Sequence, residues 1–248
     1  MENLTIPGLP FLLLTERLIV VPTPIAVDIL PYVDLFRAMH ANPDFCAMGF
    51  GPDWPPVSWT QEECRDYTRR RDVAKGWMVT GMGDFAVGLR EKGVFQTRLG
   101  NTGGRHLTDN TRIVDGDGYA RVFGEGVQAF EGVEWVGYAG VRHATWSMPE
   151  RGPTDPPLPP MEEMIEIRYG VAPEYWGKRI AGSGADAVMD WAITEKRTRR
   201  FIAETERGNS RSGRVLERMG FTMSDTNYWK NKDEQEWEKR VADTEQRF

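Results

Sequence analysis

Residues 163–221 constrain the fold most strongly, because two strand patterns there flank a single helix pattern. Residues 165–171 are rich in β-branched and aromatic side chains and stop before Pro173, where a sheet ladder cannot continue. A helix is predicted to begin near Gly177, and a second strand is predicted over 201–205. Small and apolar residues recur on one face of that helix at the helical period, namely Ala181, Ala185, Val188 and Ala192, with Ile180 and Trp191 beside them. This β-loop-α-β order predicts two adjacent parallel strands.

A small, cationic turn joins the first of these strands to the helix. Its sequence over 175–182 is YWGKRIAG, in which glycine and alanine allow close approach to the backbone. The first N–H groups of a helix lack intrahelical partners and lie at the positive end of its dipole, so this turn suits an anion such as a pyrophosphate. Close packing of the helix on the sheet is the alternative interpretation of the same small residues.

The residues around this turn resemble GNAT-fold N-acetyltransferases, and the RimJ/RimL-like branch most of all. The letters EIRYGV at 166–171 and PEYWGK at 173–178 resemble the strand and pyrophosphate loop of that superfamily. Three further stretches also match: TERL at 15–18, NSRS at 209–212 and VLERMGF at 215–221. The resemblance implies an α+β, three-layer α/β GNAT fold. Such a fold has a mixed, mostly antiparallel twisted sheet, helices on both faces and a splay between two central parallel strands.

The chain has 248 residues, which is more than a GNAT core needs. We therefore expect a single GNAT acetyltransferase domain over 1–248, with insertions at about 91–134 and 149–160. The first insertion is interpreted as extra strands or as a lid, and its DGDG at 115–118 lacks the distal glutamate of a calcium-binding EF-hand loop. The second is rich in proline, which predicts an extended connector.

By the same resemblance, the chain is expected to be an enzyme that transfers an acetyl group from acetyl-CoA to a primary amine. The amine belongs either to a small molecule or to a protein N-terminus. A second hypothesis is a catalytically degenerate GNAT protein that binds CoA as a regulatory or interaction module. A third is a nucleotide-phosphate enzyme that uses Gly182, Ser183 and Gly184, which is disfavoured because the sequence lacks both a Gly-Lys-Ser/Thr ending and a dinucleotide fingerprint.

The resemblance implies a CoA site built largely from backbone groups. The backbone of Val171 and Ala172 is expected to pair with the pantetheine amides, and the N–H of Val171 to polarise the thioester carbonyl. Asn209 and Ser212 are expected to bond the pantetheine arm from the other side. The pyrophosphate is assigned to the turn: Trp176, Gly177, Lys178, Arg179, Ile180, Ala181 and Gly182.

Two positions depart from the family pattern. Arg179 stands where the loop of the family usually has glycine, so its backbone is less free, but its guanidinium is suited to contact a phosphate. Leu216 stands where many GNAT enzymes carry a tyrosine general acid. Ser212 is therefore a catalytic candidate for protonating the leaving thiolate, with Tyr169 as the alternative donor.

Glu166 is the expected general base, because an alkyl ammonium group must lose a proton before its nitrogen attacks. It matches the glutamate that serves this role in several relatives. Alternation along the strand places Met164, Glu166 and Arg168 on one face. The alternative is that Glu166 forms an ion pair with Arg168 or another cation as a solvated strand residue.

The composition narrows the choice of partners. A hydrophobic content of 40% is enough for a buried core, and the net charge of -6 argues against a nucleic-acid partner. Cys46 and Cys64 are too few for a disulfide framework or a zinc site, and His40, His106 and His143 are scattered, so no metal site is predicted. The apolar letters FLLL are too few for a membrane segment, so we expect a cytoplasmic protein without a membrane partner. The sequence leaves the oligomeric state open.

Local patterns predict the other elements of the sheet and its helices. Strands are expected over 12–22, 85–89 and 135–142, the last two as hairpin partners. Helices are expected over 26–40 and 60–74, the second with a capping start.

Two further segments bear on the edges of the site. The aromatic loop 49–56 is interpreted either as one wall of a substrate pocket or as an ordinary connector. After Phe221, residues 222–229 and 236–241 are expected to pair as a hairpin that finishes the sheet.

Overall fold

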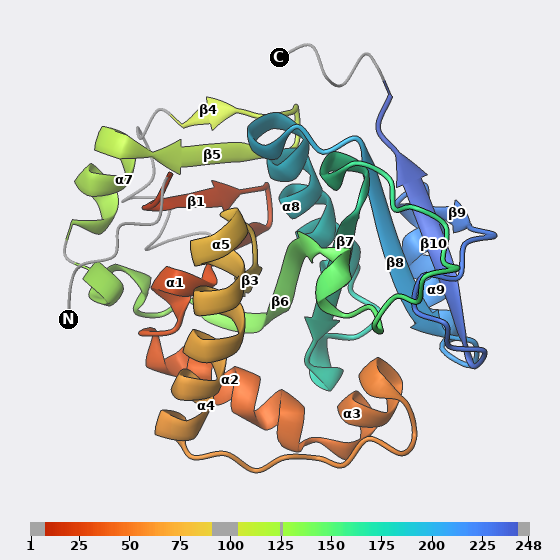
Figure 1. Cartoon of the computed structure of the whole chain (residues 1–248). Coiled ribbons are helices and arrows are strands. Elements are labelled where there is room, and N and C mark those ends of the chain that lie inside the picture. Colours follow the sequence, from red (N-terminus) through yellow and green to blue (C-terminus); the bar gives the residue numbers. More distant parts are fainter. Residues whose placement is uncertain (1–7, 91–103, 125, 243–248) are drawn as a thin grey trace.

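One mixed sheet runs through the molecule, and its strands follow the order β4-β5-β1-β2-β3-β6-β7-β8-β10-β9 (Figure 1). The structure is a computed structural model and describes residues 8–90, 104–124 and 126–242. Neighbouring strands pair antiparallel, except for the parallel pair β7 and β8. The strands are β1 (Phe11–Leu14), β2 (Leu18–Pro22), β3 (Asp84–Leu89), β4 (Arg105–His106), β5 (Arg112–Asp115), β6 (Glu134–His143), β7 (Ile165–Val171), β8 (Arg200–Glu206), β9 (Thr222–Met223) and β10 (Glu234–Arg240).

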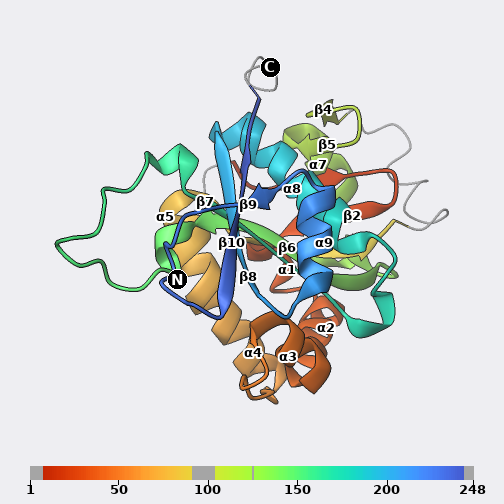
Figure 2. The same ribbon diagram turned by 90° about the vertical axis from the view of Figure 1, so that its right-hand side faces the viewer.

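Helices cover both faces of this sheet. The long helix α8 (Ile180–Lys196) packs on β6 and β7 from one side, and α2 (Leu30–Ala41) packs on β6 from the other. Both views place β4 and β5 at one end of the molecule and α2, α3 and α4 at the opposite end (Figures 1 and 2). The other helices are α1 (Thr23–Ala26), α3 (Pro43–Phe50), α4 (Gln61–Thr68), α5 (Met78–Thr80), α7 (Gly116–Phe123) and α9 (Ser210–Arg218), and a π-helical stretch (Arg69–Trp77) joins α4 to α5.

Each face of the sheet has its own apolar core. In β1, for example, Leu13 belongs to the core beneath α8, whereas its neighbours Leu12 and Leu14 belong to the core beneath α2. Consecutive residues of a strand point to opposite faces, so an unbroken run of buried residues is typical of a strand covered on both sides. The predicted three-layer arrangement is therefore confirmed.

The central β-loop-α-β unit also matches its prediction closely. Strand β7 has the predicted bounds, and β8 begins one residue earlier than predicted. Helix α8 begins at Ile180 rather than near Gly177, because Gly177 and Arg179 adopt left-handed φ values of 77° and 63° that a helix cannot contain.

The predicted splay lies between β7 and β8. These strands pair only at Ile165 with Phe201 and at Glu166 with Ile202. Beyond this point β7 stays with β6 as far as Val171, while β8 stays with β10. The two parallel strands therefore separate, and the sheet opens in its middle.

The prediction of one strand over 12–22 is wrong. The chain instead forms the hairpin of β1 and β2, in which Leu13 lies opposite Val20. The reversal occurs at Thr15, whose hydroxyl accepts hydrogen bonds from the N–H groups of Arg17 (3.2 Å) and Leu18 (2.9 Å). A side-chain turn of this kind offers the backbone an alternative to the ladder.

Several outer elements also differ from their predicted bounds. The helix predicted over 26–40 begins at Leu30, and α3 follows it as an additional helix. The helix predicted from residue 60 is confirmed with its cap, since Thr60 and Glu63 form a reciprocal capping box. The predicted terminal hairpin is largely wrong, because β9 is two residues long and β10 pairs mainly with β8.

The two expected insertions take different forms. Residues 91–103 lie outside the described residues, but the remainder of the first insertion contributes β4 and β5, and β5 extends the sheet beside β1. The prediction of extra strands is thus confirmed for that part. The proline-rich second insertion forms neither helix nor strand over 149–160 and projects from the body of the molecule (Figure 2).

Replacing Gly137 with alanine should destabilise the fold by about 1–3 kcal/mol. An added Cβ would overlap the carbonyl oxygen of Gly170 and lie 2.9 Å from Cα of Val171, where β6 and β7 meet at the splay. The urea midpoint, at an unchanged m value, measures this loss. Gly152→Ala is the matched control, because its Cβ would meet open space among the described residues, and its midpoint should equal that of the wild type. An unchanged midpoint for Gly137→Ala would contradict this close contact.

Candidate active site

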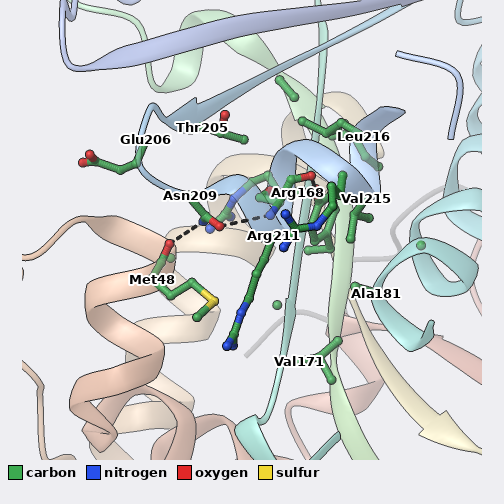
Figure 3. Close-up of a pocket in the computed structure, with 18 of the residues that line it drawn as sticks. Met48, Arg168, Val171, Ala181, Thr205, Glu206, Asn209, Arg211, Val215 and Leu216 are labelled. Atoms are coloured by element: carbon green, nitrogen blue, oxygen red, sulfur yellow. Dashed lines mark hydrogen bonds between the residues drawn. The ribbon is translucent and has the colours of Figure 1, made fainter. Parts of the chain in front are cut away.

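A cavity of about 760 Å³ occupies the place where β7 and β8 separate (Figure 3). Most residues that the sequence assigned to the site line it. Of the predicted set, only Ala172 and Lys178 are not among the lining residues. The predicted residues that line it are Glu166, Val171, Trp176, Gly177, Arg179, Ile180, Ala181, Gly182, Asn209 and Ser212.

The end of β7 directs one backbone group of Val171 into the gap. The N–H of Ala172 donates to the carbonyl of Val136 on β6 (3.0 Å). In an antiparallel ladder these bonds alternate along the strand, so the N–H of the preceding residue Val171 points away from β6, toward the gap. The carbonyl of Val171 accepts from the indole N–H of Trp176 (2.7 Å), and that of Ala172 accepts from the N–H of Tyr175 (2.9 Å). Both backbone groups of Ala172 are thus engaged within the protein.

The turn that leads into α8, together with the first residues of that helix, borders the cavity. At Gly182 an added Cβ would find only Val215 (3.8 Å) and Met219 (3.9 Å), so there is room beside the backbone. Arg179 adopts a left-handed φ of 63°, which glycine tolerates better than any other residue. This explains in physical terms why glycine suits the position, and why arginine there carries backbone strain. Lys178 instead lies over the ring of Tyr175, at 4.8 Å.

The first turn of α9 forms the opposite wall. Asn209 caps this helix, since its side-chain oxygen accepts from the N–H of Ser212 (3.0 Å), and its amide nitrogen donates to the carbonyl of Met48 (2.6 Å). Arg211 extends from α9 past Met48 toward Val171 (Figure 3). Its guanidinium lies 5.1 Å from the centre of the Trp176 ring, which fits a cation–π contact.

The hydroxyl groups of Tyr169 and Ser212 meet inside the cavity. The phenol oxygen lies 2.8 Å from Oγ of Ser212 and 3.3 Å from its carbonyl oxygen. Burial raises the pKa of Tyr169 to about 12, so the phenol remains protonated near neutral pH. One turn further along α9, Leu216 is buried and presents no polar atom to the cavity.

Glu166 is buried in an ion pair. Arg142 donates to both carboxylate oxygens, at 2.7 and 2.8 Å, and the hydroxyl of Ser147 donates a third bond at 2.6 Å. The ion pair of the expected alternative is present, with Arg142 on β6 as the other cation, but Glu166 is buried and not solvated. Arg168 pairs with Asp84 at 3.1 Å.

Three carboxyl groups that the sequence reasoning missed face the same cavity. Glu204 and Glu206 lie on β8 and Glu234 lies on β10, and a hydrogen bond joins the side chains of Glu204 and Glu234. Burial, this bond and the charge of Glu166 raise the pKa of Glu204 to about 9. Among the described residues, no salt bridge reaches any of the three. The Glu-x-Glu alternation at 204–206 and 234–236 is the sequence signal that indicates such a face.

Aromatic side chains complete the wall nearest to these carboxyl groups. Phe45 and Phe50 come from α3, Trp54 from the loop after it and Tyr138 from β6. The loop 49–56 contributes to the wall of the cavity, since Gly49, Phe50 and Trp54 line it, and its contact with a substrate stays a prediction. In the described part of the chain, no three His, Cys, Asp or Glu side chains gather in a way that would hold a metal ion.

Comparison with known proteins agrees with this architecture. Residues 114–222 match the sequence profile of the acetyltransferase (GNAT) domain. An acetyltransferase structure from Agrobacterium tumefaciens str. C58 is 20% identical, with a TM-score of 0.56 over 97% of this chain and 99% of that one. RimL, a ribosomal L7/L12 α-N-protein acetyltransferase solved in complex with coenzyme A, is 13% identical, with a TM-score of 0.52 over 95% and 97%. A putative GnaT-family acetyltransferase from Bordetella pertussis is 16% identical, with a TM-score of 0.50 over 93% and 99%.

These similarities define the fold. The chain has the GNAT fold, so the predicted fold class is confirmed. At such identities the finer assignment to the RimJ/RimL-like branch stays a prediction. Across the described ranges, no helix is long and apolar enough to cross a membrane.

Replacing Glu204 with glutamine should change how the stability of the protein depends on pH. The folded state keeps the proton of Glu204 up to about pH 9, whereas the unfolded chain releases it in the ordinary carboxyl range. The free energy of unfolding of the wild type therefore falls as pH rises between these limits, by up to about 1.4 kcal/mol for each pH unit. Glu204→Gln should lose this slope and be the more stable protein near pH 8.

The measurement is urea unfolding across this pH range. The exposed Glu217 on α9 provides the control, because Glu217→Gln should follow the wild-type curve. A wild-type slope that persists unchanged in Glu204→Gln would show that another group holds the proton.

Proposed function

We propose that the protein transfers the acetyl group of acetyl-CoA to a primary amine. The observation that carries this proposal is the cavity at the splay, which is lined by charged groups of both signs. Four arginines line it beside the turn and α9, and three carboxyl groups without a salt bridge line it beside β8 and β10. An anionic donor and a cationic acceptor would each meet complementary charge there. The arginines are Arg179, Arg211, Arg214 and Arg218.

Three features of the cavity beside the turn and Val171 fit acetyl-CoA as the acetyl donor. The turn that ends at Gly182 leaves open space beside the backbone at a helix N-terminus, as a pyrophosphate requires. The N–H of Val171 points into the gap and is placed to polarise a thioester carbonyl. A fold shared with RimL, which was solved with coenzyme A, supports the same ligand. The acetyl group would then lie where the two strands part.

In this proposal Glu204 is the base that accepts a proton from the acceptor amine. Glu166 was the sequence-based candidate, but its carboxylate already accepts three hydrogen bonds, two of them from Arg142. Glu204 has a pKa of about 9, which is close to that of an alkyl ammonium at about 10. Transfer of the proton between such groups costs little free energy, and Glu204 takes the base role in its ionised form, which gains population as the pH rises toward about 9.

The charge around Glu204 also bears on the acceptor. Glu206 and Glu234 lie in the same lining, while Arg142 and Arg168 are already paired with Glu166 and Asp84. An acceptor that brings a positive charge would offset the remaining negative charge. We therefore favour cationic amines, whether small molecules or basic protein N-termini, over acceptors that carry a carboxylate.

Acetyl-CoA should stabilise the protein against heat. At 100 times its dissociation constant a ligand contributes about 2.7 kcal/mol, which is several degrees in a domain of this size. Gly182→Trp should abolish the shift because the indole would fill the space beside the turn, whereas Gly182→Ala should retain it. A melting temperature unmoved by millimolar acetyl-CoA would remove the proposal. A shift without any loss of thioester, for every amine offered, would favour the CoA-binding module without turnover.

Among amines of equal chain length, kcat/KM should depend on the charge of the acceptor. With saturating acetyl-CoA, kcat/KM should be highest for diaminobutane, lower for butylamine and lowest for γ-aminobutyrate. A span of about tenfold corresponds to about 1.4 kcal/mol. Glu206→Gln should narrow this span without changing the KM for acetyl-CoA, and Glu217→Gln, on the exposed side of α9, should leave it unchanged. A preference for γ-aminobutyrate would contradict the proposal and point to Arg168 as a carboxylate contact.

A further inference from the structure

The contact between Tyr169 and Ser212 links two elements that are remote in sequence. Tyr169 projects from β7, and Ser212 lies in the first turn of α9. Their hydroxyl oxygens are 2.8 Å apart, and both residues line the cavity. Neither residue contributes to the capping of α9 through its hydroxyl group, because Asn209 performs that role. The pair of hydroxyls therefore has no evident structural task.

Either hydroxyl can donate in this contact, and we take Tyr169 to be the donor. A phenol has one proton, and its two nearby acceptors are Oγ of Ser212 at 2.8 Å and the Ser212 carbonyl at 3.3 Å. The shorter bond is the better one, and that carbonyl already lies within the helix ladder of α9. Burial keeps the phenol protonated, since it raises the pKa of Tyr169 to about 12. With Tyr169 as the donor, its O–H occupies one acceptor site on Ser212 and leaves the Ser212 proton to point elsewhere.

The remaining direction for the Ser212 proton is the cavity. Among the described residues, its Oγ makes no other side-chain hydrogen bond than that with Tyr169. Of the other hydroxyls in this lining, that of Tyr175 donates to Glu134, and that of Thr205 accepts from the indole of Trp237 (2.9 Å). The Ser212 hydroxyl is the donor that the first turn of α9 offers to a ligand.

We propose that Tyr169 is a positioning residue that aims the Ser212 hydroxyl at the sulfur of the departing thiolate. This inference rests on the proposed acetyl transfer. In that reaction the neutral amine attacks, a C–N bond forms, the C–S bond breaks and its electron pair goes to sulfur, while the nitrogen gives up one proton to the ionised carboxylate of Glu204. Ser212 keeps its own proton and donates a hydrogen bond to the new anion. A hydrogen bond to a charged acceptor is stronger than one to a neutral acceptor.

The test is the pKa of the thiol of bound CoA, a readout that needs no turnover. Thiolate absorbance in the ultraviolet reports it, with the S-methyl derivative of CoA as the reference that cancels the protein signal. In the wild type the thiol should titrate below free CoA by about one pH unit or more. Tyr169→Phe should return much of this difference, and Ser212→Ala should return all of it. The double variant should match Ser212→Ala, because Tyr169 acts through Ser212.

The controls separate this inference from the proposed function. Tyr67→Phe removes a phenol that does not line the cavity, and it should leave the thiol pKa at its wild-type value. If CoA fails to bind the wild type, the acetyl-transfer proposal fails first. If CoA binds and the thiol pKa is equal in the wild type and Tyr169→Phe, the positioning role is overturned. Ser212→Ala leaves Tyr169 in place, so an unchanged thiol pKa in that variant also overturns it, even where Tyr169→Phe folds poorly.

Discussion

The separation of β7 and β8 after two paired residues is the constraint on which the site depends. Parallel strands normally continue side by side, and their N–H groups are then used in the ladder. Here the N–H of Val171 has no strand opposite it, so a polar group is exposed in the middle of a sheet without being left on an outer edge. The arrangement is stable because β7 pairs with β6 and β8 pairs with β10 on their other sides. Apolar cores also cover both faces of the sheet. A rigid sheet thus presents an unpaired backbone donor to a ligand.

The same strand geometry determines which charged side chains around this gap are paired. Glu166 and Arg142 lie directly opposite each other on β7 and β6, and their burial is offset by two hydrogen bonds between them. Removing one partner of such a pair would leave a buried charge, which is far more costly than the pair itself. Glu204 avoids an unpaired charge in another way, because it keeps its proton and forms a hydrogen bond with Glu234. The charge of Glu166 is therefore balanced by a cation, and that of Glu204 is removed by protonation.

Local patterns in the sequence were sufficient for the parts of the fold that are local. Strand β7, helix α8 and strand β8 follow from apolar periodicity, and the turn at Gly182 follows from its small residues and cations. The partner of Glu166 could not be predicted, because alternation along β7 suggests Arg168, whereas the register between β6 and β7 selects Arg142. The carboxyl pair was missed for the same reason. Glu204 and Glu234 meet only through the pairing of β8 with β10, and the register of that pair cannot be predicted from either segment alone. The strand predicted over 12–22 failed because a single threonine hydroxyl captures two N–H groups and reverses the chain.

The position of β10 has a consequence for the order in which the protein can be made. This strand is the last one among the described residues, yet it lies between β8 and β9 and not at the border of the sheet. During translation, β8 emerges with one side open, and an open strand invites contacts with other chains until it is covered. Glu234 therefore joins the cavity only after β10 inserts beside β8. A nascent chain that stops before β10 has Glu204 and Glu206 but lacks the group that forms a hydrogen bond with Glu204.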